Sequence, residues 1–184
     1  RLKDIYAKIK FIHAKVIKEI FIADNNSINK VEIFKAMEEA LKFEKEASTR
    51  MKELKNEKMI KESKELLSDI WCNIGEYYAK FDIKVEYCEK AYVESVNNNQ
   101  SNVFALYALS ILYMKKANYN EAQRYIDLLL REDESNEDAL ALLISVLNAK
   151  KSNESSITYL EDTISKQPNA YHLIELYIEI LRRS

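Results

Sequence analysis

The chain has 184 residues, of which 47% are hydrophobic and 32% are charged, a balance typical of folded rather than disordered proteins. Its single glycine and single proline are too few for an all-β protein, which needs turn residues about every 8–12 positions. The formal net charge of −2 comes from 28 basic and 30 acidic residues that are well mixed, so the sequence indicates neither a nucleic-acid binder nor a membrane-surface helix.

Membrane-spanning and disulfide-rich classes are also excluded. No apolar run approaches the roughly 18–20 residues that span a membrane, and the charged first residues do not form the core of a secretory signal. The two cysteines, Cys72 and Cys88, are too few for a disulfide scaffold and suit the reducing cytoplasm. Because the chain begins with Arg1, we expect it to be part of a longer protein.

The first predicted element is an amphipathic helix of about six turns. Its apolar residues recur at steps of three and four and form one stripe: Leu2, Ile5, Ile9, Ile12, Val16 and Ile20. The stretch Ala23–Ser27 interrupts this helix, because Asn and Ser side chains favour turns and helix caps.

A second predicted helix starts near Asn29. Its buried face is marked by Val31, Phe34, Met37 and Leu41. The charged residues that follow, Glu44–Glu65, predict a solvated helix that touches its neighbours along a narrow apolar seam. The seam contains Ala47, Met51 and Leu54. A coiled-coil arm is the alternative, but the seam loses its spacing at residues 58–60.

The rest of the chain repeats with a period of 34 residues. When Val103–Asn136 is aligned on Glu137–Ala170 without a gap, apolar residues coincide: Leu106 with Leu140, Leu109 with Leu143, Tyr113 with Leu147, and Ile126 with Leu160. A further shift brings Ile174, Tyr177 and Leu181 to the same positions. A period of this length in a helical chain indicates stacked helix–turn–helix units.

The only tryptophan and the only glycine lie four residues apart, at Trp71 and Gly75. With Ile74 and Tyr78 they match the pattern W-x2-L-G-x2-Y, so this segment resembles the first helix of a tetratricopeptide repeat. A glycine within a helix costs about 1 kcal/mol relative to alanine. We therefore interpret Gly75 as permitting a close approach of the two helix backbones of one repeat, with Tyr78 filling the space between repeats. Later repeats supply further motif residues: Tyr113, Ala122 and Pro168.

The resemblance implies an all-α, right-handed superhelical solenoid of stacked antiparallel helix pairs. We place long helices, a linker or a divergent repeat, at residues 1–67. Repeats follow at 68–102, 103–136 and 137–170, and the first helix of another at 171–184. No later helix covers the apolar side of this last segment, which holds Ile174, Tyr177, Ile178 and Leu181. We expect the protein to continue there, or another chain to cover this face.

Neither a catalytic site nor a metal site is indicated. A single glycine excludes a glycine-rich phosphate loop. His13 and His172 lack metal-ligand spacing, and we interpret both as surface or groove residues. The carboxylates are spread over helix surfaces, and no nucleophile has a base nearby. We therefore expect no enzyme, no cofactor and no small-molecule substrate.

Repeat solenoids bind partners on the concave surface lined by their first helices. We predict a partner site with an apolar centre of Phe104, Tyr107 and Ile111, surrounded by Glu76, Asp138 and Glu175. Other residues expected to face this groove are Cys72, Ala141, Ser145, His172 and Glu179. The groove lacks the basic and amide side chains with which chaperone-binding tetratricopeptide domains hold a terminal carboxylate. It suits a helix or extended protein segment with apolar anchors and basic character.

A narrower resemblance rests on the start of the third repeat, Asn136, Glu137 and Ala139, on the turn Pro168–Asn169, and on the close Ile178–Arg183. These motifs resemble the large subunit of intraflagellar transport complex A, which is built wholly of tetratricopeptide repeats. The resemblance implies a scaffold at the cilium or ciliary base that helps return cargo from the ciliary tip, with other subunits as partners. The alternative is an adaptor or regulatory module that captures a peptide segment of a client protein.

Overall fold

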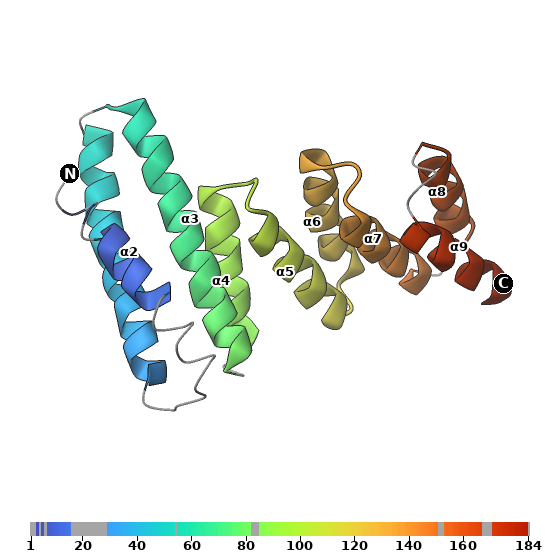
Figure 1. Ribbon diagram of the computed structural model, residues 1–184, viewed down its shortest axis with the longest axis horizontal. Helices are drawn as coiled ribbons and strands as arrows, with labels where there is room; N and C mark the ends of the chain where they lie inside the picture. The colour runs from blue at the N-terminus through green and yellow to red at the C-terminus, as the bar shows by residue number, and fades with distance from the viewer. Residues whose placement is uncertain are drawn as a thin grey trace. The chain divides into compact units, whose positions relative to one another are not determined.

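The computed structural model describes residues 3, 5, 7–15, 29–53, 55–81, 85–150, 153–166 and 171–183. All regular structure in these ranges is helical, which confirms the predicted all-α class (Figure 1). A helical N-terminal segment, residues 3, 5 and 7–15, is followed by α2 (Asn29–Glu53), α3 (Glu57–Lys80), α4 (Val85–Asn98), α5 (Val103–Lys115), α6 (Tyr119–Glu132), α7 (Glu137–Ala149), α8 (Asn153–Lys166) and α9 (Tyr171–Arg183). The chain forms two compact units, Arg1–Asn102 (the N-terminal unit) and Val103–Ser184 (the C-terminal unit). Several residues of the sequence predictions lie outside the described ranges: Leu2, Val16, Ile20, Leu54, Pro168 and Asn169.

In the N-terminal unit, α3 packs against both α2 and α4. One side of each helix contributes to a shared core: Phe11, Ala14, Ile33, Ala36, Met37, Ala40, Ile70, Ile74, Tyr77 and Ala91. Aromatic rings extend this core, with Phe34 and Tyr77 stacked at a centroid distance of 5.3 Å. The motif residue Tyr78 lies between the other two helices, because its ring is 5.5 Å from Phe34 on α2 and 5.8 Å from Tyr87 on α4.

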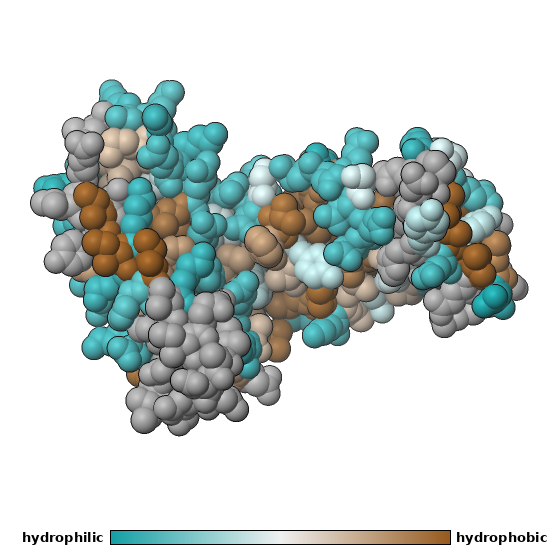
Figure 2. All heavy atoms as spheres, in the orientation of Figure 1, coloured by the Kyte–Doolittle hydropathy of each residue, from teal (hydrophilic) through white to brown (hydrophobic). Residues whose placement is uncertain are grey.

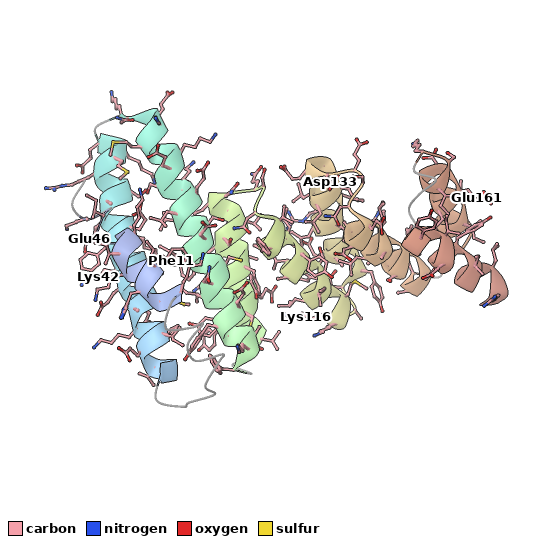
Figure 3. All side chains as sticks on the ribbon, viewed as in Figure 1. Phe11, Lys42, Glu46, Lys116, Asp133 and Glu161 are labelled. Carbon is pink, nitrogen blue, oxygen red and sulfur yellow. The ribbon has the colours of Figure 1, made fainter. Side chains whose placement is uncertain are left out.

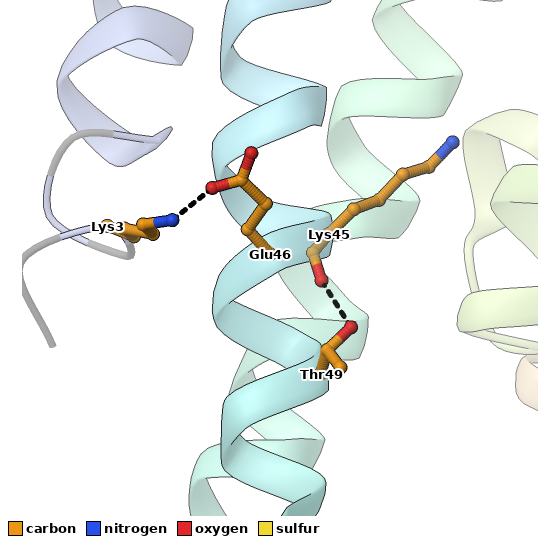
Figure 4. A network of polar contacts seen from close by, with 4 residues as sticks. All are labelled: Lys3, Lys45, Glu46 and Thr49. Carbon is orange, nitrogen blue, oxygen red and sulfur yellow. Dashed lines mark hydrogen bonds and ion pairs between the residues drawn. The ribbon is translucent and has the colours of Figure 1, made fainter.

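The N-terminal segment buries the side opposite to the predicted isoleucine stripe. Its buried residues are Ala7, Phe11 and Ala14, and Figure 3 labels Phe11. The described isoleucines of the stripe are exposed: Ile5 by 46%, Ile9 by 56% and Ile12 by 60%. Small alanines let the segment lie close to α2, and the ion pairs Lys3–Glu46 and Lys10–Glu39 join the two (Figure 4 shows the first). The stripe is therefore not the core-facing side of this helix.

The predicted continuous helix over residues 44–65 is wrong, because α2 ends at Glu53 and α3 begins at Glu57. At the break, Lys55 has a left-handed φ of 52°, and Asn56 Oδ1 accepts a 3.1 Å hydrogen bond from Met59 N. This asparagine cap starts α3 without glycine or proline. The stretch is not evenly solvated either, since the fully buried Glu44 accepts a 2.5 Å hydrogen bond from Ser63 Oγ.

The buried face of α2 also differs from the prediction at its first turn. Val31 is 74% exposed, whereas Ile33 is fully buried. Residues two positions apart in sequence lie about 200° apart around the helix axis, so only one of Val31 and Ile33 can face the core. The predicted seam is confirmed at Ala47 and Met51, which are both buried.

Gly75 on α3 lies beneath the ring of Tyr92 on α4. A Cβ at residue 75 would lie 2.6 Å from Tyr92 Cε1 and 2.8 Å from Cδ1, distances that a real Cβ does not tolerate. The glycine thus makes room for an aromatic side chain of α4, a neighbour that the repeat motif did not predict. Burial raises the pKa of Tyr92 far above its usual value, as expected for a phenol enclosed at a helix crossing.

A buried polar network joins α3 and α4 next to this crossing. Ser95 Oγ on α4 donates to the backbone oxygen of Ser68 on α3 at 2.8 Å, and the two hydroxyl oxygens lie 3.0 Å apart. Asn102, in the loop after α4, donates from Nδ2 to Ser68 Oγ at 2.9 Å. Buried polar groups need such partners, so the network holds the loop that contains Asn102 against α3 and α4.

In the C-terminal unit each helix packs against the next, and α7 also contacts α5 and α9. Residues related by the 34-residue period are buried alike: Leu106 and Leu140 are 0% and 1% exposed, Leu109 and Leu143 are 0% and 4%, and Ile126 and Leu160 are both 0%. In α5, Ser110 occupies the glycine position of the motif and is fully buried. Its Oγ donates a 2.9 Å hydrogen bond to the backbone oxygen of Leu106 in the same helix. The period therefore predicted the core of this unit correctly.

Candidate interaction surface

The first helices of the C-terminal repeats lie side by side, because α7 contacts both α5 and α9. Residues of the predicted partner site fall on these three helices. We call the following set the α5–α7–α9 surface: Phe104, Tyr107, Ile111, Asp138, Ala141, Ser145 and Glu175. Residues 34 apart occupy equivalent places on successive helices, so Tyr107, Ala141 and Glu175 form one row across the surface.

The α5 part of the surface is apolar and open. Phe104 is 75% exposed and Tyr107 is 38% exposed, whereas Ile111 is half-buried. Large apolar side chains are usually buried, so two exposed aromatic residues one helical turn apart are informative. The residues between them in sequence, Ala105 and Leu106, are fully buried, so α5 turns its other side toward the core.

The α7 part is acidic and begins at a well-defined helix start. Asn136 Oδ1 accepts a 2.9 Å hydrogen bond from Ala139 N, and Ala139 is fully buried. Glu137 and Asp138 follow the cap, exposed, where carboxylates are favoured by the helix dipole. The Asn-Glu-x-Ala motif noted in the sequence thus has a structural role in starting α7.

The turn before α7 adds a further carboxylate, Asp133, which Figure 3 labels. Its Oδ1 accepts hydrogen bonds from Ser135 N at 2.9 Å and Ser135 Oγ at 2.6 Å. The Ser135 side-chain and backbone donors lower the pKa of Asp133, so it is ionised at neutral pH. The end of the C-terminal unit that holds the start of α7 is therefore acidic.

Two predicted groove residues, Cys72 and Glu76, lie on α3 and so belong to the N-terminal unit. Cys72 is buried, so its assignment to an open groove is wrong. Glu76 is half-buried, and its charge is one cause of the raised pKa of Tyr92, after burial and the neighbouring Cys72. The side chains of His172 and Glu179 lie outside the described part of the structure.

Val103 and Tyr171 are further exposed apolar residues of α5 and α9 that were not predicted from the sequence. They are 42% and 73% exposed, and both share a repeat position with Glu137. The 34-residue period could have identified them, because it places all three at the start of a first helix. With Phe104 they extend the exposed apolar area on α5 and α9.

The last helix presents a partly open apolar face. Ile178 and Leu181 are 43% and 46% exposed, whereas Ile174 and Tyr177 are half-buried. Tyr177 Oη donates to Glu161 on α8 at 2.7 Å, which ties α9 to the preceding pair. Ile144 is the repeat equivalent of Ile178 and is fully buried in the pair of α7 and α8.

The described ranges contain no group of three or more His, Cys, Asp or Glu side chains placed to hold a metal ion. Within the same ranges, no helix has both the length and the apolar character that crossing a bilayer requires.

Comparisons with known proteins agree with this architecture. Residues 105–152 match the family of the Fis1 C-terminal tetratricopeptide repeat. No curated protein matches the chain.

Three solved structures share the fold at low sequence identity. The assembly chaperone of RpL4, Acl4, has a TM-score of 0.53 and 13% identity over 83% of this chain, which spans 62% of that chain's length. A tetratricopeptide repeat protein from Parabacteroides merdae has a TM-score of 0.50 and 16% identity, covering 93% of this chain and 72% of that one. YrrB, described as a tetratricopeptide protein with an unusual peptide-binding site, has a TM-score of 0.50 and 15% identity, covering 88% and 99%. Residues 105–152 thus match a tetratricopeptide-repeat family, and the chain shares the helical-repeat fold of these three structures.

Proposed function

We propose that this protein is a protein–protein interaction scaffold and that a partner binds its α5–α7–α9 surface. The observation that carries the proposal is the exposure of Phe104 and Tyr107 on one face of α5, at 75% and 38%. Aromatic anchors commonly contribute about 2 kcal/mol or more each to an interface. Covering two such exposed side chains with a partner removes apolar surface from water and so stabilises the complex.

The chemistry of the surface suggests the kind of partner. Asp138 and Glu175 are exposed on the neighbouring helices α7 and α9. Acidic side chains beside an apolar centre favour a segment with apolar anchors and basic flanks, either helical or extended. Rim charges of this kind act mainly on the association rate and its salt dependence.

The test is a binding titration with a partner captured from the source cell and then purified. Tyr107→Ala should weaken binding by about tenfold or more, because it removes a central anchor. Glu175→Ala should have little effect at high salt, where exposed charges are screened. Helix content measured by circular dichroism controls for folding.

Tyr87 on α4 offers a matched control, because it is another half-exposed tyrosine, at 51%. Tyr87→Ala should leave the affinity unchanged. An unchanged affinity for Tyr107→Ala in a folded protein would mean that the partner uses another surface.

A narrower form of the proposal is a structural subunit of intraflagellar transport complex A in retrograde ciliary transport. Its support is the sequence resemblance at Asn136–Ala139 and Ile178–Arg183. This form places the protein in the cytoplasm and at the cilium or ciliary base, with other subunits of one complex as partners. Affinity capture followed by mass spectrometry should then recover several subunits in constant ratio.

The alternative is an adaptor in which the same surface captures a peptide segment of a client. The open aromatic pair on α5 suits a single short segment as well as a large subunit. In this case a synthetic peptide from the client should reproduce the affinity of the whole client. A peptide without measurable affinity, beside a stable multi-subunit assembly, would favour the structural scaffold.

A further inference from the structure

The side chains that the N-terminal segment buries are few and mostly small. Among its described residues, Ala7, Phe11 and Ala14 are buried, spaced by four and three along one side of the helix. Phe11 and Ala14 belong to the core that the segment shares with the neighbouring helices. We call the α2 part of this core the covered face: Ile33, Ala36, Met37 and Ala40. These four side chains are all buried, so the covered face is apolar.

Ion pairs join the segment to α2 beside the covered face. Lys10 Nζ lies 2.6 Å from Glu39 Oε2, and Lys3 pairs with Glu46. The four side chains remain between 34% and 48% exposed to solvent. Ion pairs with this exposure contribute little to stability and are screened by salt.

A third lysine of the segment faces α3. Burial raises the pKa of Asp69 on α3, and the positive charge of Lys15 opposes this rise, which places the lysine near that carboxylate. Lys15 Nζ also lies 5.1 Å from the centre of the Phe11 ring. Three carboxylates on two helices therefore each have a lysine of the segment nearby.

The larger apolar side chains of the segment stay in solvent. Ile5, Ile9 and Ile12 are 46%, 56% and 60% exposed, and Figure 2 shows apolar side chains gathered over this segment. Two alanines and one phenylalanine bury less apolar area than α3 does, whose buried residues include Ile70 and Ile74. Elements with few buried apolar contacts open locally before the rest of a fold.

We propose that the N-terminal segment is an exchangeable strap, which opens while α2, α3 and α4 stay folded and gives up the covered face to a basic helix of a partner protein. The partner helix would present small residues and one aromatic residue at the spacing of Ala7, Phe11 and Ala14. In the closed chain the strap is an autoinhibitory contact. This site lies in the N-terminal unit and does not depend on the α5–α7–α9 surface.

The carboxylates beside the covered face define the charge of the partner. When the strap opens, Glu39, Glu46 and Asp69 lose their lysines, and a helix with cations at equivalent places restores the pairing. An acidic helix would meet three like charges instead. A second copy of this chain offers the same strap and gains no contact that the closed chain lacks, so exchange between copies is disfavoured.

Hydrogen–deuterium exchange of the full chain tests whether the strap opens by itself. Amides of residues 7–15 should exchange at least about tenfold faster than those of α3 between Ile70 and Tyr77. High salt should speed exchange in residues 7–15 and leave α3 unchanged, because it screens the lysine pairs. Equal rates in the two regions would overturn the proposal, since the segment would then open only when the whole unit unfolds.

A fluorescent peptide with the sequence of residues 1–15 tests binding to the covered face. Lys10→Glu in the full chain loosens the strap, so this chain should bind the peptide about fivefold or more tighter than the unmodified chain does. Phe11→Ala in the peptide should weaken binding by about tenfold or more. Ile9→Ala in the peptide is the matched control and should change little, because Ile9 is 56% exposed in the docked segment. Equal losses for the two peptide variants, or no binding to either chain, would overturn the proposal.

A charge exchange identifies the site at which the peptide binds. The Glu39→Lys chain should bind a Lys10→Glu peptide about fivefold or more tighter than the unmodified peptide. Arg124→Glu breaks an exposed ion pair with Glu121 on α6 and, as a control, should leave both affinities unchanged. An unaltered preference in the Glu39→Lys chain would overturn the proposal. A dimer in sedimentation that the peptide dissociates would also overturn it, because a second copy would then occupy the covered face.

Discussion

At the glycine position of the repeat motif, α3 carries Gly75 and α5 carries Ser110, and the surroundings of the two residues differ. Gly75 lies beneath the Tyr92 ring, where a Cβ would be 2.6 Å from the nearest ring atom. Ser110 is equally buried but already has a Cβ, and its hydroxyl bonds to its own helix at Leu106 O. The pair of α3 and α4 thus places an aromatic ring over a glycine, whereas the pair of α5 and α6 stacks Tyr113 on Tyr125 at a centroid distance of 5.6 Å.

The two pairs also differ in buried polar contacts. The pair of α3 and α4 contains the bond between Ser95 Oγ and Ser68 O at 2.8 Å, with Asn102 bonded to Ser68 Oγ. In the C-terminal unit, the buried Ser110 bonds within one helix. The same motif position therefore tolerates different residues, provided that the second helix supplies a matching side chain. Each difference can be tested by substitution.

The largest effect is expected for Gly75→Leu. Overpacking a crossing typically costs about 1–3 kcal/mol and occasionally more, and leucine would have to displace the buried Tyr92 ring. We expect the free energy of unfolding to fall by about 3 kcal/mol or more. Urea denaturation followed by circular dichroism measures the free energy of unfolding. An unchanged midpoint would contradict the claim that Tyr92 leaves no room for a side chain at residue 75.

A buried serine network should give the next effect. Ser68→Ala removes the acceptor of Asn102 Nδ2 and a partner of Ser95 Oγ, and should cost about 1–3 kcal/mol. Ser145→Ala is the matched control, because Ser145 is exposed and bonds only to Ala141 O within α7 among the contacts described. Equal melting temperatures for the two variants would show that the network adds nothing.

Gly75→Ala adds a single methyl group and so tests how tightly Tyr92 packs on residue 75. The Tyr92 ring has to move, which opposes the gain of about 1 kcal/mol that alanine brings to a helix. We expect a net loss of about 0.5–2 kcal/mol. Ser110→Ala, at the same motif position, should stay within about 0.5 kcal/mol, because its Cβ is already accommodated.

A double variant resolves the cause. In a Tyr92→Ala background, Gly75→Ala should be neutral or stabilising by up to about 1 kcal/mol. If Gly75→Ala remained equally destabilising without the ring, the contact with Tyr92 would not be its cause.

The smallest differences should occur where the two units are alike, at their asparagine caps. Asn56 and Asn136 accept bonds from backbone nitrogens at 3.1 Å and 2.9 Å, whereas the Asn118 bond is longer, at 3.4 Å. Asn56→Ala and Asn136→Ala should each cost about 1 kcal/mol, and Asn118→Ala about 0.5 kcal/mol. Thermal unfolding of the three variants checks the order, and a larger loss for Asn118→Ala would contradict it.

The sequence predicted the C-terminal unit better than the N-terminal one, for physical reasons. A 34-residue period compares each apolar residue with an equivalent, so Leu106 and Leu140 could be assigned to the core together. The N-terminal segment offers two candidate faces, and apolar spacing favoured Ile9 and Ile12 over the smaller Ala7 and Ala14. Close packing against α2 selected the alanine face instead. The motif also could not predict that Tyr92 contacts Gly75, because the position of this ring depends on how α4 packs against α3.

Hydrogen–deuterium exchange of the chain with and without a purified partner tests the α5–α7–α9 surface most directly. Our account predicts that protection increases in α5, α7 and α9, around Phe104–Ile111, Asp138–Ser145 and Glu175, while α6 and α8 are unchanged. Increased protection in α6 and α8, with no change in the three first helices, would contradict it.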